Sequence, residues 1–284
     1  MKKLYEEDDV QKIADAIRTK TGKSDKMKVG GMPTEISEIV GYTIDQILTG
    51  NGITKIASEA VTSLREGACW GMTDITSISL PNLTTCGSYT FSGCSSVNEI
   101  SLPNLVSCKN YTFSACKSLT KLSLPNLTTC GNYVFSGCSK LTELSLPNLT
   151  TCDSYIVTGT PLTKIVLPKL KIMPNSIFNQ AKSLKFIDTP ALQTVNGMYC
   201  FTYCQCEMHW MLRQNTVIPM TSSAALSNSW FASSGKPAYI YVPSVLIDSY
   251  KTATNWATYA DRFRALEDYT VDGTTTGELD ESKI

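Results

Sequence analysis

A 22-residue repeat dominates this sequence and limits what the chain can fold into. The string Ser-Leu-Pro-Asn-Leu begins at Ser79, Ser101, Ser123 and Ser145, and degenerate copies begin at Val166 and Asp188. The prolines of these copies stand at positions 81, 103, 125, 147, 168 and 190, so the steps are 22, 22, 22, 21 and 22 residues. Self-similarity at such a period is typical of solenoids, in which each turn packs only against its neighbours.

Within each turn the apolar residues keep fixed positions. One turn carries Leu80, Leu83, Cys86, Phe91, Cys94, Val97 and Ile100, and the next carries Leu102, Leu105, Cys108, Phe113, Cys116, Leu119 and Leu122. Ile100-Ser101-Leu102 alternates apolar and polar residues, as a half-buried strand does, and the following proline ends the pairing. The pattern predicts a mainly β fold: an elongated solenoid of about six 22-residue turns, each a strand with irregular or short extended corners.

The eleven cysteines of this chain suggest a disulfide scaffold at first sight. Their spacing favours another interpretation. Cys86, Cys108, Cys130 and Cys152 form one 22-residue series, and Cys94, Cys116 and Cys138 form a second. Later turns place Met173 and Ala181 at these positions, which indicates that the thiols pack inward as small apolar groups. Bridges between neighbouring members of a series remain the alternative.

The bulk composition excludes some classes of partner. The formal net charge is zero, so no basic field attracts nucleic acid or an anionic membrane. No apolar run reaches the roughly 18 residues that a membrane-spanning helix needs. The first residues, Met1 to Glu7, become acidic where a signal peptide would be apolar, so we expect no export leader and no membrane anchor.

The corners of the turns carry a family resemblance. They read Tyr89-Thr90-Phe91-Ser92-Gly93-Cys94, Tyr111-Thr112-Phe113-Ser114-Ala115-Cys116 and Tyr133-Val134-Phe135-Ser136-Gly137-Cys138. Together with the preceding Leu-Pro, they resemble BspA-like leucine-rich repeats over about 150 residues. The resemblance implies a leucine-rich-repeat solenoid and, because the family serves surface adhesion among many roles, says little about the ligand.

Both flanks resemble segments of phage and prophage structural proteins from Gram-positive gut bacteria. At the N-terminus the resemblance rests on the stretch from Asp9 to Ile39, including Thr21-Gly22-Lys23-Ser24-Asp25 and Gly31-Met32-Pro33. At the other end it rests on Tyr239 to Pro243, Leu246 to Lys251 and Asn255-Trp256. The resemblance implies a virion component whose N-terminal module contacts other virion proteins.

Periodicity divides the flanks into modules. Residues 1–45 are predicted to form two short amphipathic helices, and a capping or anchoring face is expected from Val10, Ile13, Ile17, Ile36 and Ile39. Residues 46–206 are the solenoid. Residues 207–267 are a mixed α/β cap with a strand at 238–242, a helix at 243–253 and an apolar cover of Trp256, Tyr259, Phe263 and Leu266. Residues 268–284, polar and acidic, are expected to be a flexible tail.

One cluster of metal-ligating residue types is present. Cys200, Cys204, Cys206 and His209 could hold zinc, but Phe201 and Cys204 align with Phe91 and Cys94 of the repeat once one residue is inserted. Packing therefore explains Cys204, and no metal site or cofactor is predicted. No nucleophile elbow, phosphate loop or paired carboxylates mark the solenoid, so no catalytic residues are assigned.

Two further series recur at 22-residue spacing through four turns. Tyr89, Tyr111, Tyr133 and Tyr155 precede the inward Phe position by two, so an extended corner would turn them inward as well. Either they pack against neighbouring turns, or they form an exposed aromatic stripe that contacts a sugar or a protein. Asn82, Asn104, Asn126 and Asn148 are expected to satisfy backbone groups of the turns.

The sequence thus favours a non-enzymatic protein that presents a repeat stack. The leading hypothesis is a phage or prophage virion protein used for host attachment or as a capsid or tail decoration. The alternative is a bacterial cell-surface adhesin of the BspA-like kind that binds a host protein or glycan. Homo-oligomer formation is left open, because no heptad pattern is present to support it.

Overall fold

A computed structural model describes residues 54–59, 61–204, 207–226, 238–278 and 280–283. It confirms the predicted fold class, a mainly β parallel solenoid of about 22-residue turns with few helices. The chain divides into two compact units, of which the first ends at Leu144 and the second begins at Ser145. Among the described residues, no helix is long and apolar enough to cross a membrane.

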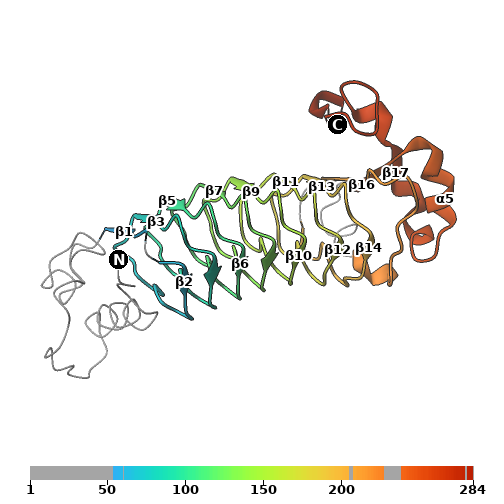
Figure 1. Ribbon diagram of the computed structural model, residues 1–284. Coiled ribbons are helices and arrows are strands. Elements are labelled where there is room, and N and C mark those ends of the chain that lie inside the picture. Colours follow the sequence, from blue (N-terminus) through green and yellow to red (C-terminus); the bar gives the residue numbers. More distant parts are fainter. Residues whose placement is uncertain (1–53, 60, 205–206, 227–237, 279, 284) are drawn as a thin grey trace, which may run out of the picture. The chain divides into compact units, whose positions relative to one another are not determined.

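The first unit contains two parallel sheets, each built from one strand per turn. One sheet contains β1 (Lys55–Ala57), β3 (Ser77–Ser79) and β5 (Glu99–Ser101), and β7 (Lys121–Ser123) is the corresponding strand of the next turn. The other sheet contains β2 (Ser63–Leu64), β4 (Thr85–Cys86), β6 (Ser107–Cys108) and β8 (Thr129–Cys130) as neighbours. Figure 1 shows these strands side by side. Ile78 pairs with Ile56 and Ile100, so the register is one full repeat. Each turn therefore has a second, shorter strand at the predicted extended corner.

The second unit contains strands of the same two kinds, followed by the cap. Its short strands are β10 (Thr151–Cys152), β12 (Ile172–Met173) and β14 (Thr194–Val195), while β9 (Glu143–Ser145) spans the boundary. A five-stranded sheet contains β11 (Lys164–Val166), β13 (Phe186–Asp188), β15 (Met208–Met211), β16 (Ala238–Val242) and β17 (Phe263–Ala265), all paired in parallel. The helices are η1 (Ser223–Leu226), η2 (Ser244–Leu246), α5 (Ile247–Thr252), η3 (Ala257–Arg262), η4 (Leu266–Tyr269) and η5 (Glu281–Lys283).

The core is a set of ladders in which each side chain packs on its copy one turn away. Phe91, Phe113 and Phe135 are fully buried, and their ring centroids are 5.6 and 5.7 Å apart. The leucines of the Leu-Pro-Asn-Leu segments are buried as well. Because one turn cannot bury its own apolar face, this stacking is the main source of stability.

The cysteines form the inward ladders that the spacing predicts. Cys86, Cys108, Cys94 and Cys116 are buried free thiols. In the second series each sulfur contacts a backbone carbonyl 25 residues earlier, as in the pairs Cys94 to Cys69 and Cys116 to Phe91, at 3.1 and 3.3 Å. The thiols thus pack and hydrogen-bond to the backbone as small side chains.

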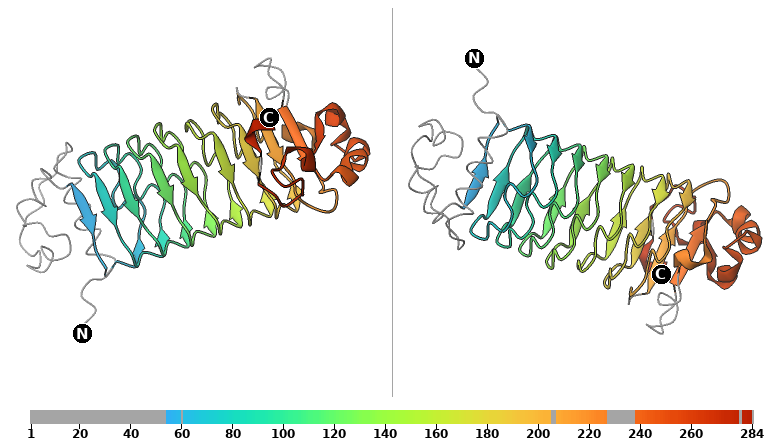
Figure 2. Two further views of the ribbon diagram at one scale, coloured as in Figure 1. Left: turned by 90° about the horizontal axis from the view of Figure 1, so that it is seen from above. Right: turned by 90° about the horizontal axis from the view of Figure 1, so that it is seen from below.

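The cap confirms most of its predicted elements. Strand β16 has the predicted bounds, and the predicted helix at 243–253 is present as η2 followed by α5. Trp256, Tyr259, Phe263 and Leu266 are all buried. Figure 2 shows these helices, in orange and red, beside the last strands of the second unit.

The C-terminal segment differs from its expected flexible state. Arg213 donates hydrogen bonds to the carbonyl oxygens of Thr275 and Gly277 at 2.7 and 3.0 Å, and the Asp280 N–H donates to Tyr269. Residues 270–278 therefore fold back over the second unit. A segment without apolar periodicity is held here by polar contacts to the guanidinium of Arg213, whose side chain is 11% exposed, and no local pattern reveals these contacts. The N-terminal module, with Val10, Ile13, Ile17, Ile36 and Ile39, lies outside the described residues.

We predict that the buried thiols resist alkylation in the folded protein. Burial raises the pKa of Cys94 and of Cys108 to about 12, which lowers their thiolate fraction at pH 8 about a thousandfold relative to an ordinary thiol. Cys152 is only half-buried. Iodoacetamide labelling followed by peptide mass spectrometry should modify Cys152 well before Cys94 and Cys108. In guanidinium chloride all three should react alike; equal rates in the native protein would contradict the inward ladders.

Candidate functional site

The tyrosine series lies at a left-handed corner of each turn. Tyr89, Tyr111 and Tyr133 have φ angles of 58°, 58° and 56°, in the left-handed region that bulky residues rarely adopt. The Tyr89 and Tyr111 N–H groups donate to the carbonyls of Asn110 and Asn132 in the next turn, at 2.9 and 2.8 Å. The corner is therefore bent and not extended, so Tyr89 is exposed while Phe91, two residues later, is buried.

The rings of this series form a stacked row on the first unit. Centroids of Tyr89 and Tyr111 are 4.8 Å apart with planes 4° from parallel, and those of Tyr111 and Tyr133 are 4.9 Å apart at 5°. Trp70 extends the row beyond Tyr89 at 6.5 Å and a 52° tilt. Trp70 is 55% exposed and Tyr89 38% exposed. The two sequence interpretations thus combine: the rings pack against neighbouring turns and also keep an exposed edge.

Trp70 was not anticipated from the sequence. It stands where later turns carry Ser92 and Ser114, so it belongs to none of the recurring aromatic positions. The preceding turn has Gly67 at the left-handed position that Tyr89 occupies in the next one. A comparison of the first turn with the others could have marked Trp70 as an aromatic residue without a core position.

The geometry of the row determines what it can contact. Parallel rings at this spacing cover one another's faces, so a sugar ring finds no open face between them. Their edges remain available. The hydroxyls of Tyr89 and Tyr111 have no hydrogen-bond partner within the described part of the chain, and the exposed indole of Trp70 adds apolar area. Together these groups offer a polar, aromatic edge with a 4.8 to 4.9 Å repeat.

Tyr155 belongs to the second unit and has the same backbone conformation, with φ of 63° and its N–H donating to the Ser176 carbonyl at 3.1 Å. Its side chain is half-buried. The same corner position then carries Ser176 and Tyr199, and Tyr199 and Tyr203 are exposed at left-handed corners. A strict 22-residue count from Tyr155 reaches Tyr199 after two steps, and the same count from Gly137 reaches Tyr203 after three, so the spacing could have identified both.

The asparagine series satisfies backbone groups, as predicted. Asn82, Asn104 and Asn126 each donate from Nδ2 to a carbonyl 23 residues earlier, at 2.7, 2.8 and 2.8 Å. In the second unit the Asn148 side-chain oxygen accepts a bond from Lys169. These amides therefore tie one turn to the next.

The Cys-His cluster is used in packing. The Cys204 sulfur contacts the Phe178 carbonyl at 3.2 Å, the same contact that Cys94 makes, which confirms its alignment with the repeat. His209 is buried, stacks on Phe186 at 5.3 Å and shares a 2.8 Å hydrogen bond with the Tyr241 hydroxyl. Burial, with a smaller effect of Lys185, lowers the pKa of His209 to about 4. Cys206 lies outside the described residues, among which no group of three metal-ligating side chains converges.

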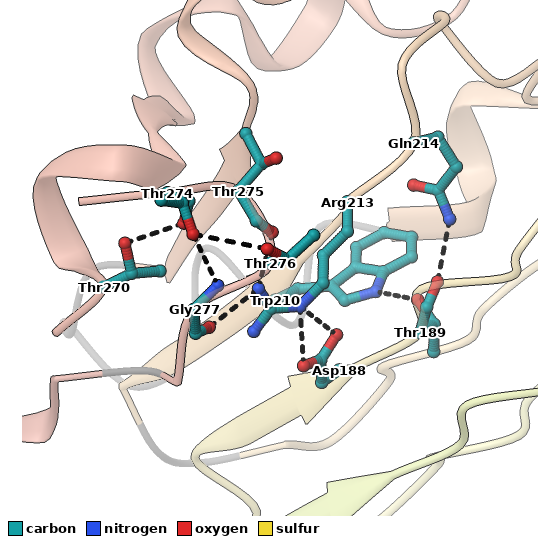
Figure 3. Close-up of polar contacts among 10 residues, drawn as sticks. All are labelled: Asp188, Thr189, Trp210, Arg213, Gln214, Thr270, Thr274, Thr275, Thr276 and Gly277. Atoms are coloured by element: carbon teal, nitrogen blue, oxygen red, sulfur yellow. Dashed lines mark hydrogen bonds and ion pairs between the residues drawn. The ribbon is translucent and has the colours of Figure 1, made fainter. Parts of the chain in front are cut away.

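An ion-pair network joins β13 to the C-terminal segment. Arg213 donates from Nε to both carboxylate oxygens of Asp188, at 2.9 and 3.1 Å, and from Nη1 to the two C-terminal carbonyls (Figure 3). Burial raises the pKa of Asp188 although Arg213 opposes the shift. Nearby, Trp210 and Gln214 donate to the hydroxyl and the carbonyl of Thr189. Arg213 thus connects strand and tail.

Comparison with protein families gives one match, to the family described as "BspA type Leucine rich repeat region (6 copies)". Its matched regions are residues 62–185 and 106–234, which together span more than half of the chain. No curated protein matches the sequence significantly.

Several solved structures are similar at low identity. A leucine-rich repeat protein of T. pallidum has 23% identity and a TM-score of 0.46 over 53% of this chain and 76% of its own. A leucine rich cell surface protein of Faecalibacterium prausnitzii has 18% identity and a TM-score of 0.46, over 60% and 57%. A leucine-rich repeat protein of Bacteroides ovatus has 18% identity and a TM-score of 0.41, over 65% and 60%. The matches thus cover less than two thirds of the last two proteins.

We predict that Tyr111→Gly is less destabilising than Tyr111→Ala. Both variants lose the two ring contacts, but alanine keeps the left-handed conformation that costs about 1 kcal/mol for a residue with Cβ, whereas glycine relieves it. In urea unfolding, the free energy of unfolding of the glycine variant should be about 1 kcal/mol larger than that of the alanine variant. An alanine variant as stable as the glycine variant would contradict the left-handed corner.

We also predict an acid-dependent contribution of His209 to stability. Its pKa is about 4 in the folded protein and about 6.5 in the unfolded chain, so the fold favours the neutral ring. The contribution is fully present above pH 6.5 and is lost as pH falls toward 4, by about 2 to 3 kcal/mol. The free energy of unfolding, measured in urea at pH 7.0 and at pH 4.5, should decrease more on acidification in the wild type than in His209→Gln. Asp188 is common to both proteins, so its opposite shift cancels; equal losses would contradict the prediction.

Proposed function

Because the chain belongs to the BspA-type leucine-rich repeat family, we propose that it is a non-enzymatic binding protein of the bacterial cell surface. Repeat proteins of this kind present one long periodic surface, and binding is the function that such a surface serves. The description of the similar Faecalibacterium protein as a cell surface protein agrees with this proposal.

The observation that carries the proposal is the stacked row of Trp70, Tyr89, Tyr111 and Tyr133. Aromatic side chains at an exposed surface provide large contact area at little entropic cost and are enriched at binding sites. Here four of them converge on one edge, although each tyrosine occupies an unfavourable backbone conformation. Backbone strain that recurs at one surface position is more often found at functional sites than elsewhere.

The chemistry of the row favours a protein over a stacked sugar. The inner ring faces are covered, so the contacts come from ring edges, hydroxyls and the Trp70 indole. Such groups suit hydrogen-bonding side chains and backbone carbonyls of a protein surface. A glycan that uses hydroxyl contacts alone is the second class of ligand to test.

The virion hypothesis stays a prediction. It depends on the N-terminal module, which lies outside the described residues, and on a short likeness in the cap. The family match concerns the repeats and not these flanks. A position of the gene among capsid and tail genes would favour the virion hypothesis, and incorporation of the protein into particles that is lost on deleting residues 1–40 would support it directly.

The proposed function predicts saturable binding to cells through the aromatic row. Fluorescently labelled full-length protein is added to cultured epithelial cells, untreated or treated with protease or glycosidases, and binding is measured by flow cytometry. The Tyr89→Gly, Tyr111→Gly double variant, which keeps the backbone conformation, should bind at least about tenfold more weakly, because each lost aromatic anchor costs 1 kcal/mol or more.

Val106→Ser is the matched control, since Val106 is 42% exposed in the same unit and lies outside the row. It should bind as the wild type does. Loss of binding after protease treatment would identify a protein receptor, and loss after glycosidase treatment a glycan. Absence of saturable binding, or equal binding by both variants, would refute the role of the row.

A further inference from the structure

A hollow of about 660 Å³ lies in the second unit, between the outer face of β11 and β13 and the C-terminal residues 276–278. Its volume is in the range of small-molecule sites. Arg213 and Asp188 form part of its wall, next to the folded-back tail (Figure 3). Thr276, Gly277 and Glu278 of the C-terminal segment line one side of the hollow.

The floor of this hollow is apolar where the repeat is elsewhere polar. Val166 and Phe186 line it. In the first unit the position of Val166 is occupied by Ala57, Ser79, Ser101 and Ser123, and that of Phe186 by a serine or a charged residue. Val166 is nevertheless 40% exposed, so its side chain is not required to fill the core. The two residues place an apolar patch on an outward face that lines the hollow.

The two cations of the hollow lie on the side of the strands and can contact an anionic group. Arg213 and Lys164 both act on the carboxylate of Asp188, while the second carboxylate of the lining, Glu278, belongs to the C-terminal segment. Arg213 uses Nε and Nη1 for its bonds, while Nη2 donates to none of the described residues. A guanidinium has five N–H donors, so it can accept a second carboxylate beside the first.

We propose that this hollow binds an organic monocarboxylate with an apolar chain. The carboxylate lies against Arg213 and Lys164, and the chain covers Val166 and Phe186. Glu278 on the opposite wall carries a like charge and therefore disfavours ligands with several carboxylates. A free fatty acid of medium length and the C-terminal apolar residue of a peptide both have this chemistry. The proposal concerns the second unit and does not depend on the aromatic row of the first.

The test is isothermal titration calorimetry of the full-length protein with four probes. Octanoate represents a free fatty acid and N-acetyl-Gly-Leu-Phe a peptide terminus. Octanol and the C-terminal amide of the same peptide are their neutral analogues. At least one of the two carboxylates should bind, and octanol and the peptide amide should bind at least about tenfold more weakly, because a hydrogen bond to a charged group is lost. Octanoate binding would identify a fatty acid site, and peptide binding a site for chain ends.

Matched variants locate the binding. Lys164→Gln and Val166→Ser change exposed residues of the hollow, and each should weaken binding several-fold without unfolding the unit. Lys185→Gln and Ile172→Ser are the controls, since Lys185 is exposed outside the hollow and Ile172, at 41%, is as exposed as Val166. Equal binding of octanoate and octanol, equal effects of both pairs of variants, or no binding of any carboxylate would overturn the proposal.

Discussion

Parallel pairing in a register of one repeat is the constraint on which the rest of this structure depends. Each residue of a turn faces its own counterpart in the next turn, as Ile56, Ile78 and Ile100 do. A residue type is therefore acceptable only if it stacks well on itself, or if it alternates with a complementary one. Phenylalanine, asparagine and thiol ladders satisfy the first condition, and the Lys121–Glu143 ion pair, at 2.5 Å, satisfies the second. Low charge in the repeats follows directly, because stacked like charges repel.

The same constraint explains how tyrosine tolerates a left-handed corner. An isolated tyrosine with positive φ costs about 1 to 2 kcal/mol, which glycine would avoid. In a ladder each added ring gains a stacked neighbour worth about 0.5 to 1.5 kcal/mol beyond its burial. The two terms are comparable, so the tyrosines are tolerated as a set, whereas the turn with Gly67 uses the residue that needs no neighbour. Stability alone does not demand tyrosine here, which is why we propose a role in binding for the row.

The part of the fold that follows from periodicity could be predicted from the sequence. The strands, the inward cysteines and phenylalanines, the asparagine contacts and strand β16 all repeat or alternate in a way that a single chain displays. The left-handed corner could not be predicted, because a spacing of two between Tyr89 and Phe91 implies a shared side only in extended backbone. The ordered tail was missed for a related reason. Arg213 and Thr275 are 62 residues apart in the sequence, and no local sequence pattern predicts a polar contact between residues so far apart along the chain.

The exceptions to the repeat are therefore the most informative positions for function. A ladder residue is explained by its neighbours above and below, so its identity carries little information about a ligand. Trp70 and Val166 have no such explanation, since their counterparts in the neighbouring turns are small, polar or charged. Both are exposed, and burial therefore does not account for them either. Phe186, in contrast, stacks on His209 of the next turn. Val166 shares a hollow with the ion pair that holds the tail, which places apolar surface and a spare hydrogen-bond donor together. Both candidate sites thus lie where self-stacking no longer dictates the residue, one on each unit of the chain.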